Sequence, residues 1–468
     1  MTVNPLLFIL LLIGLCVGAP GVLKFFMVCC LLGAAAVVSV PALGGAPITP
    51  GVFALPLLLL WALRAHGLPA LRAGLQAQQP GRWLLLLTAW GAASAAVLPR
   101  LLAGATDVFT TNRSDALSLG VLRMGLQPVS TNLTQAAYLI AGLATFVAVR
   151  ALLSAPGGMQ RFGAAVRLLA WANLAAVVLN LAETYLHLPS LLDLVRNAGY
   201  ATMVGGDIGG LQRISGTFPE ASAWAFFTMP LFAFAASLWA DRCQPRSTGL
   251  LAGLTLAALL FSTSSTAYSA LALYLGGLAV LALLRLVSTA GHYRIGPLAP
   301  VLWGAAVVSC LVLLLLPEAG SVIATYFDQT MLRKLQSASG VERSSWNLQA
   351  WHNFVDSGGL GIGLGSGRAS SFPMVLLSNL GVLGVLLFGL FVAALHRSRR
   401  AAPAPEQAIR RAALRAVWAA LITASVSGSI FDLGLMFYTL AAGAAGPLLA
   451  AAARPQTSAA RARTGAAA

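Results

Sequence analysis

The sequence predicts an all-α fold, a polytopic transmembrane bundle of about 12 to 14 helices, from three observations. Of the 468 residues, 58% are hydrophobic and only 9% are charged, and the mean hydropathy is +0.83. A soluble chain of this length needs more charge to cover its surface, whereas lipid contact removes that need. The apolar residues form runs of about 20, the length of a membrane-crossing helix. No hydrophilic stretch is long enough for a large separate core, so 1–468 is predicted to be a single transmembrane domain.

The apolar runs are separated by charged or turn-forming residues, and each run predicts one helix. They fall at 4–18, 21–41, 51–65, 83–99, 131–153, 164–182, 219–240, 247–263, 266–286, 298–316, 374–395, 412–430 and 434–453. No positive charge precedes the first run, so we interpret it as a membrane segment rather than a cleavable signal peptide.

The basic residues are distributed unequally between the two sets of connecting loops. One set, together with the C-terminal tail, holds 20 of the 29 basic residues but only Asp241 and Glu406 of the 13 acidic residues. The positive-inside rule therefore predicts that this set is cytoplasmic. The net charge of +16 is then explained by membrane orientation and anionic lipid headgroups, and we do not expect a nucleic-acid partner.

The five cysteines give no sign of a metal site or a disulfide framework. They are Cys16, Cys29, Cys30, Cys243 and Cys310, and none forms a C-x-x-C pair. We therefore expect neither a disulfide framework nor a zinc site. We expect no cofactor.

Three loops are predicted to face outward, at about 100–130, 183–218 and 317–373. Short connections are usual in helix bundles, so long loops on one side suggest that function resides there. The last is a large extracytoplasmic loop inserted between membrane helices, and we expect it to contain short helices.

The second outer loop ends in a polar segment that leads into an apolar helix. The segment runs from Arg213 to Glu220, and Pro219 suits a first helical turn, with Ser215 or Thr217 as the cap. The helix N-terminus and the fork of donors on Arg213 could together bind a phosphate. The alternative is that Arg213 only reaches the membrane interface and Glu220 only complements the helix dipole.

The third outer loop predicts an amphipathic helix through Asp356 that lies on the outer surface. His352 has a side chain suited to proton transfer, although a lone histidine on such a helix is more often simply solvated. Arg343 precedes this helix, and Arg368 follows a run of alternating glycines from Gly358 to Gly367. No strand precedes those glycines, so they do not predict a dinucleotide site, but they let the backbone approach a ligand or a helix closely.

Arg213, Arg343 and Arg368 are thus three outward arginines near apolar helices. Because arginine is costly at the bilayer, their grouping indicates an anionic ligand at headgroup depth, and a lipid pyrophosphate is the obvious candidate.

At these residues the chain resembles the O-antigen polymerase and O-antigen ligase superfamily of bacterial membrane glycosyltransferases. The resemblance covers roughly residues 200–395 and rests on the order of three features. These are Arg213-x-Ser215-Gly216-Thr217-Phe218-x-Glu220, then Thr263-Ser264-Ser265-Thr266-Ala267-Tyr268, and the long loop with its glycine-rich exit.

The resemblance implies a metal-independent glycosyl transfer at the outer, periplasmic face of a bacterial inner membrane. The donor would be a glycan on undecaprenyl pyrophosphate, gripped by Arg213, Arg343 and Arg368. A base, Glu220 or His352, would deprotonate the acceptor sugar hydroxyl. The resemblance also implies two further partners, membrane lipids and a protein that regulates chain length.

Two departures favour a polymerase of O-antigen, capsule or exopolysaccharide repeats over a ligase. Ligases place a histidine before the helix that leaves the large loop, where this chain reads Ser370-Ser371-Phe372-Pro373. Many members also have Ser-Arg where this chain has Ser264-Ser265. A ligase that transfers glycan to lipid A-core or protein is one alternative, and a flippase for lipid-linked oligosaccharides is another.

Overall fold

The computed structural model describes residues 5–40, 46–111, 121–198, 207–208, 211–288, 338–397 and 404–448. Within these ranges it contains thirteen α-helices, and seven of them are long and apolar enough to cross a membrane. The predicted all-α polytopic bundle is therefore confirmed. The expected helix at 298–316 and the first part of the large loop lie outside the described residues.

The helices follow the apolar runs of the sequence. The first seven are α1 (Pro5–Cys16), α2 (Gly18–Leu31), α3 (Pro50–Ala73), α4 (Pro80–Leu101), α5 (Ser130–Leu153), α6 (Gly158–Tyr185) and α7 (Ala221–Ala240). The others are α8 (Pro245–Phe261), α9 (Ser265–Ser288), α13 (Ala338–Asp356), α14 (Phe372–Arg397), α15 (Ala404–Ser427) and α16 (Gly434–Ala445). A short 3₁₀ turn spans Leu192–Val195.

The run 21–41 was predicted as one helix, but α2 ends at Leu31. The chain beyond it is held by tertiary hydrogen bonds instead of helical ones. Ala34 donates its N–H to the Thr217 carbonyl at 2.9 Å, and Ala36 donates to Asn197 Oδ1 at 2.9 Å. These distant partners satisfy the backbone, so the apolar run can leave the helical path.

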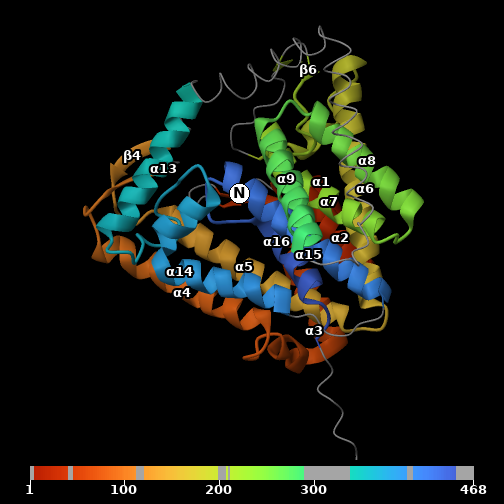
Figure 1. Cartoon of the computed structure of the whole chain (residues 1–468), viewed down its shortest axis with the longest axis horizontal. Coiled ribbons are helices and arrows are strands. Elements are labelled where there is room, and N and C mark those ends of the chain that lie inside the picture. The colour runs from red at the N-terminus through yellow and green to blue at the C-terminus, as the bar shows by residue number, and fades with distance from the viewer. Residues whose placement is uncertain are drawn as a thin grey trace, which may run out of the picture.

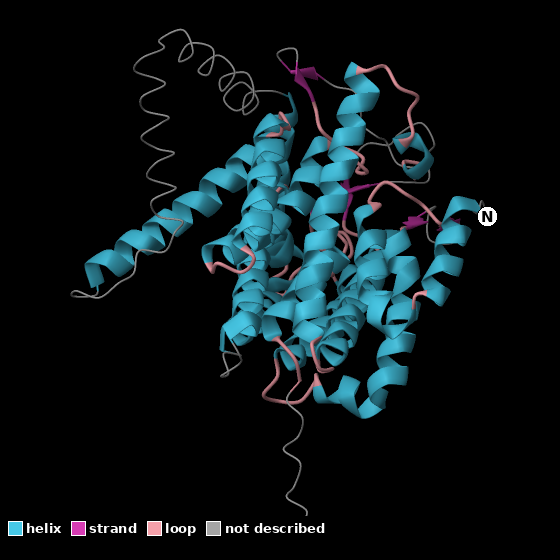
Figure 2. Ribbon diagram, turned by 90° about the vertical axis from the view of Figure 1, so that its right-hand side faces the viewer, coloured by secondary structure: helices cyan, strands magenta, loops and turns pink. Residues whose placement is uncertain are grey.

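Three two-stranded antiparallel sheets join the helices, and none of them was predicted. They pair β1 (Val38–Val40) with β2 (Ala46–Ile48), β3 (Asp107–Thr111) with β4 (Val121–Gly125), and β5 (Asp207–Ile208) with β6 (Leu211–Gln212). Figure 2 shows these short strands in the upper half of a molecule that is otherwise a bundle of helices.

Helix α7 lies at the centre of the bundle. Within its apolar window, 83% of the residues are buried, and it packs against α8, α9 and α15. Arg411 of α15 pairs with Asp241 after α7 at 3.1 Å, and Arg415 donates to Ser237 at 3.0 Å. The start of α15 therefore lies beside the end of α7, so the two helices are antiparallel.

The same end of the bundle gathers other basic residues that were predicted to share one side. Arg150 is 1% exposed and donates to Gln79 Oε1 and to the Gly446 carbonyl. The α13 helix and the β3–β4 hairpin lie together elsewhere, where α13 packs against α14 and β3 (Figure 1). The described chain thus has a basic end and an end that carries Glu220, Asp432 and α13.

Candidate functional site

A cavity of about 470 Å³ lies between α7, α15 and α16 at the end opposite the basic one. That volume falls in the range of small-molecule sites. Glu220 and Ser222, at the start of α7, line its polar part together with Asp432. Pro230 of α7 and Leu440 of α16 line it farther along their helices, so the cavity extends from two carboxyl groups into an apolar interior.

The segment that presents Glu220 is held by hydrogen bonds from Asn180 of α6 and from Arg196, which follows the 3₁₀ turn. Asn180 of α6 accepts the N–H groups of Ser215 and Gly216 at 3.1 Å each through Oδ1. Arg196 donates from Nε to the Gly216 carbonyl at 2.9 Å. Gly216 has φ +53°, where a side chain would also press on Trp224. The turn is therefore rigid before any ligand binds.

Arg196, which helps to hold this segment, was not predicted from the sequence as a site residue. Burial lowers the pKa of Arg196, and the carboxylates of Glu183 and Asp193 oppose that shift. An arginine remains charged under these conditions, so its charge lies directly behind the Ser215–Glu220 segment. The family resemblance indicated Arg213, whereas the arginine that holds the turn is Arg196.

The predicted cap of the following helix is wrong in detail. Glu220 is the N-cap residue, and α7 begins at Ala221. Thr217 instead donates its hydroxyl to the Leu31 carbonyl at 2.6 Å, and Ser215 Oγ accepts from Arg196. The two hydroxyls therefore fix the segment before α7, through the end of α2 and through Arg196.

Glu220 is half-exposed to the cavity, and Ser222 donates its hydroxyl to Glu220 Oε1. This bond orients one carboxylate oxygen along the start of α7. The other oxygen remains available to a hydroxyl in the cavity, which is what a base for an acceptor sugar needs.

Asp432, in the loop between α15 and α16, is the second carboxyl group of the cavity. Its Oδ1 accepts the Gly434 N–H at 2.9 Å, and its own N–H donates to Gln135 Oε1 at 3.1 Å. Burial raises the pKa of Asp432, while the Gly434 hydrogen bond lowers it. A carboxyl group with a raised pKa beside a cavity is a candidate proton acceptor. A lone aspartate between two apolar runs gave no pattern by which the sequence reading could find it.

Arg368 reaches the wall of the cavity through Ser429. Its Nη2 donates to Ser429 Oγ at 2.9 Å, and Ser429 and its neighbour Ile430 line the cavity. The guanidinium also lies over the Trp346 ring, 5.7 Å from the centroid. The two contacts fix the plane of the arginine fork, which favours recognition of a phosphate or carboxylate.

The glycine-rich segment before Arg368 packs against helices rather than forming an open phosphate cradle. Gly361 has φ +85°, and a Cβ there would lie 2.6 Å from the Gly381 nitrogen. Asn379 of α14 accepts the N–H groups of Gly365 and Gly367 at 3.0 and 3.3 Å. The close approach expected of these glycines is made to α14 and neighbouring helices, and it places Arg368.

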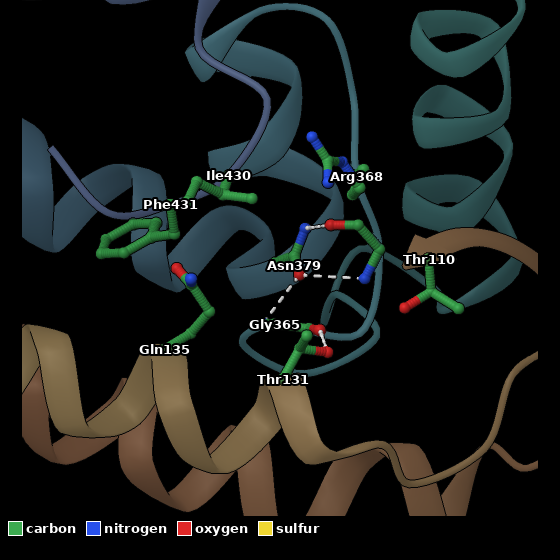
Figure 3. Close-up of a pocket in the computed structure, with 9 residues that line it drawn as sticks. Thr110, Thr131, Gln135, Gly365, Arg368, Asn379, Ile430 and Phe431 are labelled. Carbon is green, nitrogen blue, oxygen red and sulfur yellow. Dashed lines mark hydrogen bonds between the residues drawn. The ribbon is translucent and has the colours of Figure 1, made fainter. Parts of the chain in front are cut away.

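A smaller hollow of about 30 Å³ lies beside Arg368 (Figure 3). Thr110, Gln135 and Asn379 contribute polar groups to it from three separate elements. Ile430 lines both this hollow and the larger cavity, and Gln135 also binds the Asp432 backbone. The hollow and the cavity therefore share one wall, and we treat them as one candidate site.

The α13 helix presents Arg343 and His352 differently. Arg343 is half-buried and lies one turn before Trp346, whose ring contacts Arg368. Of the arginines predicted to bind phosphate, Arg343 therefore lies on the helix that contacts Arg368. His352 is exposed, and its neighbour Val355 on the same side of the helix is 54% exposed. The structure therefore places His352 on an outward surface of α13.

Arg213 is half-buried, and its Nε has no hydrogen-bond partner in the described part of the chain. It does not line either described hollow. Of the predicted residues, Glu220 thus lines the cavity and Arg368 is hydrogen-bonded to its wall, while Arg343 lies on the helix whose Trp346 contacts Arg368.

Among the described residues, no group of three or more His, Cys, Asp or Glu side chains could hold a metal ion. Comparison with protein-family models, curated proteins and solved structures finds no match for this chain.

Proposed function

We propose that the chain transfers a glycan from a polyprenyl pyrophosphate carrier to the hydroxyl of an acceptor sugar, and so polymerises lipid-linked repeat units. The observation that carries the proposal is the cavity with two carboxyl groups at one end, apolar walls beyond them, and Arg368 hydrogen-bonded to its wall. A lipid-linked substrate has the matching order of parts, an apolar chain, an anionic group and a sugar.

The charges of the site suit this reaction. A carboxylate, from Asp432 or Glu220, takes the proton of the acceptor hydroxyl as its oxygen bonds to the anomeric carbon. The bond between that carbon and the pyrophosphate oxygen breaks, and the carrier pyrophosphate leaves with the electron pair. Arg368 stabilises the charge that develops there, with Arg343 and Arg213 as further candidates.

The cellular setting is part of the same proposal. The multi-pass helices support a membrane protein, and the basic end of the bundle is proposed to face the cytoplasm. The cavity then opens at the periplasmic side of a bacterial inner membrane. A ligase would use the same donor chemistry with a different acceptor, so the acceptor assay separates it from a polymerase.

The test uses the full-length protein in liposomes with a polyprenyl-pyrophosphate oligosaccharide as donor and acceptor. The proposal predicts longer lipid-linked oligomers and free polyprenyl pyrophosphate, in the presence of EDTA as well as in its absence. Arg368→Ala is expected to reduce the product by about a hundredfold, as loss of one anion-stabilising donor does elsewhere. Unchanged product from Arg368→Ala would remove that residue from the site, and no oligomer from the wild-type protein would refute the polymerase.

A further inference from the structure

The turn between α8 and α9 is polar and deeply buried, and the cavity does not include it. Thr263 and Ser264 are each 1% exposed. Neither Thr263 Oγ1 nor Ser264 Oγ has a hydrogen-bond partner in the described structure. Buried hydroxyl groups are nearly always paired, so two adjacent unpaired ones require an explanation.

Ser264 lies at a position where a serine hydroxyl normally has a hydrogen-bond partner. The Tyr268 N–H donates to the Ser264 carbonyl at 3.1 Å, so Ser264 is the N-cap of the 24-residue helix α9. A serine at this position ordinarily accepts an N–H from the first turn of its own helix. Here the Ser264 hydroxyl makes no such bond.

The backbone of the turn is also strained at Thr263. Thr263 has φ +50°, a left-handed conformation that is rare for a β-branched residue. Strain of this kind is maintained by the surrounding structure and gathers at ligand sites. The neighbouring Ser262 is different, because its hydroxyl donates to the Leu259 carbonyl at 2.7 Å.

The turn lies at the same end of the bundle as Glu220. Short connections join α7 to α8 and α8 to α9, so the helices alternate in direction and the starts of α7 and α9 share one end. Helix α15 packs against both α7 and α9, and it ends at Ser427, which lines the cavity.

We infer that the start of α9, with the hydroxyls of Thr263 and Ser264, forms a binding site for a phosphoryl group. The ligand oxygens would accept from the two unpaired hydroxyls at the start of the helix. The positive end of the α9 dipole would balance their charge without a basic side chain in the turn. The phosphoryl group could belong to a lipid headgroup or be free in solution, and this site stands independently of the proposed glycosyl transfer.

The test measures thermal unfolding of the purified full-length protein in a neutral detergent by tryptophan fluorescence. One arm titrates inorganic phosphate, and the other compares phosphatidic acid with diacylglycerol, which lacks the phosphate. Ser264→Ala and Thr263→Val each remove one unpaired hydroxyl. Ser262→Ala is the matched control, because it removes a paired hydroxyl from the same turn.

We expect the wild-type protein and Ser262→Ala to be stabilised by phosphate or by phosphatidic acid. The apparent Kd should rise at least about tenfold in Ser264→Ala and Thr263→Val, the loss expected for one hydrogen bond to a charged group. A response to phosphate identifies a free ion, and a response to phosphatidic acid alone identifies a lipid headgroup.

Equal responses from the wild-type protein and Ser264→Ala, or no response from either, would overturn the inference. The two hydroxyls would then be buried groups that hold at most a water molecule. If Thr263→Val does not fold, Ser264→Ala alone decides the result. A failed glycan-transfer assay would leave this outcome unaffected, because the measurement requires no activity.

Discussion

Replacing Asn379 by alanine tests whether the glycine-rich segment is held from α14. Asn379 is fully buried and makes four side-chain hydrogen bonds to backbone groups. It accepts from Gly365 and Gly367, and it donates to the carbonyls of Gly367 and Val375 at 3.0 Å each. No other described side chain binds so many backbone groups of this segment.

The magnitude follows from those four bonds. A net value of about 0.5–1.5 kcal/mol for each gives a loss of roughly 2–6 kcal/mol in the free energy of unfolding. The measurement is unfolding of the detergent-solubilised protein by SDS titration, followed by tryptophan fluorescence. Because the same segment places Arg368, glycan transfer should fall even where the variant remains folded.

Asn173→Ala is the matched control. Asn173 is also fully buried, but it makes two hydrogen bonds, to Thr228 and Trp224, away from the glycine-rich segment. Its expected cost is about half that of Asn379→Ala. If Asn173→Ala proves the more destabilising of the two, the assignment of Asn379 as the residue that holds the segment is refuted.

Three further variants test the site. The rate of glycan transfer by the wild-type protein should rise as the pH passes through the raised pKa of Asp432, and Asp432→Asn should lack that rise. A pH–rate profile of each protein measures this. The raised pKa also means that the folded state holds this proton more tightly than the unfolded state. Asp432 therefore contributes stability at low pH that is lost as pH rises above its ordinary value of 3.8, and unfolding of Asp432→Asn should lack that slope. Arg196→Lys should lower the rate of glycan transfer while leaving the free energy of unfolding close to that of the wild-type protein. One ammonium group cannot bind the Gly216 carbonyl and the Ser215 hydroxyl with the geometry of a guanidinium. A transfer rate equal to that of the wild-type protein would contradict this prediction. Arg368→Lys should transfer glycan as poorly as Arg368→Ala, because lysine lacks the planar guanidinium that lies over Trp346 while it binds Ser429. Wild-type transfer by Arg368→Lys would show that the stacking of the guanidinium on Trp346 is not needed.

The membrane helices could be predicted from the sequence because lipid contact requires long apolar runs. Each run that falls within the described residues became a helix, apart from the portion of 21–41 beyond Leu31. That portion is decided by contacts with Thr217 and Asn197, which lie about 160 residues or more away. A local apolar pattern carries no information about such partners.

The candidate site was predictable in part for the same reason. Arg368 and Glu220 stood out because charged residues are rare beside apolar helices. Asp432 and Arg196 could not be found, because their roles come from a cavity and a buried turn that only the packing creates. The exposed position of His352 likewise depends on which face of α13 meets the bundle.

The most direct test of the proposed function is the profile of lipid-linked glycans in cells that lack the protein, resolved by repeat number. The proposal predicts that single repeat units accumulate and long polymer disappears, and that wild-type protein but not Arg368→Ala restores the polymer. Long polymer left on the carrier would indicate a ligase, and repeats retained on the cytoplasmic leaflet would indicate a flippase. An unchanged profile would contradict a role in glycan assembly altogether.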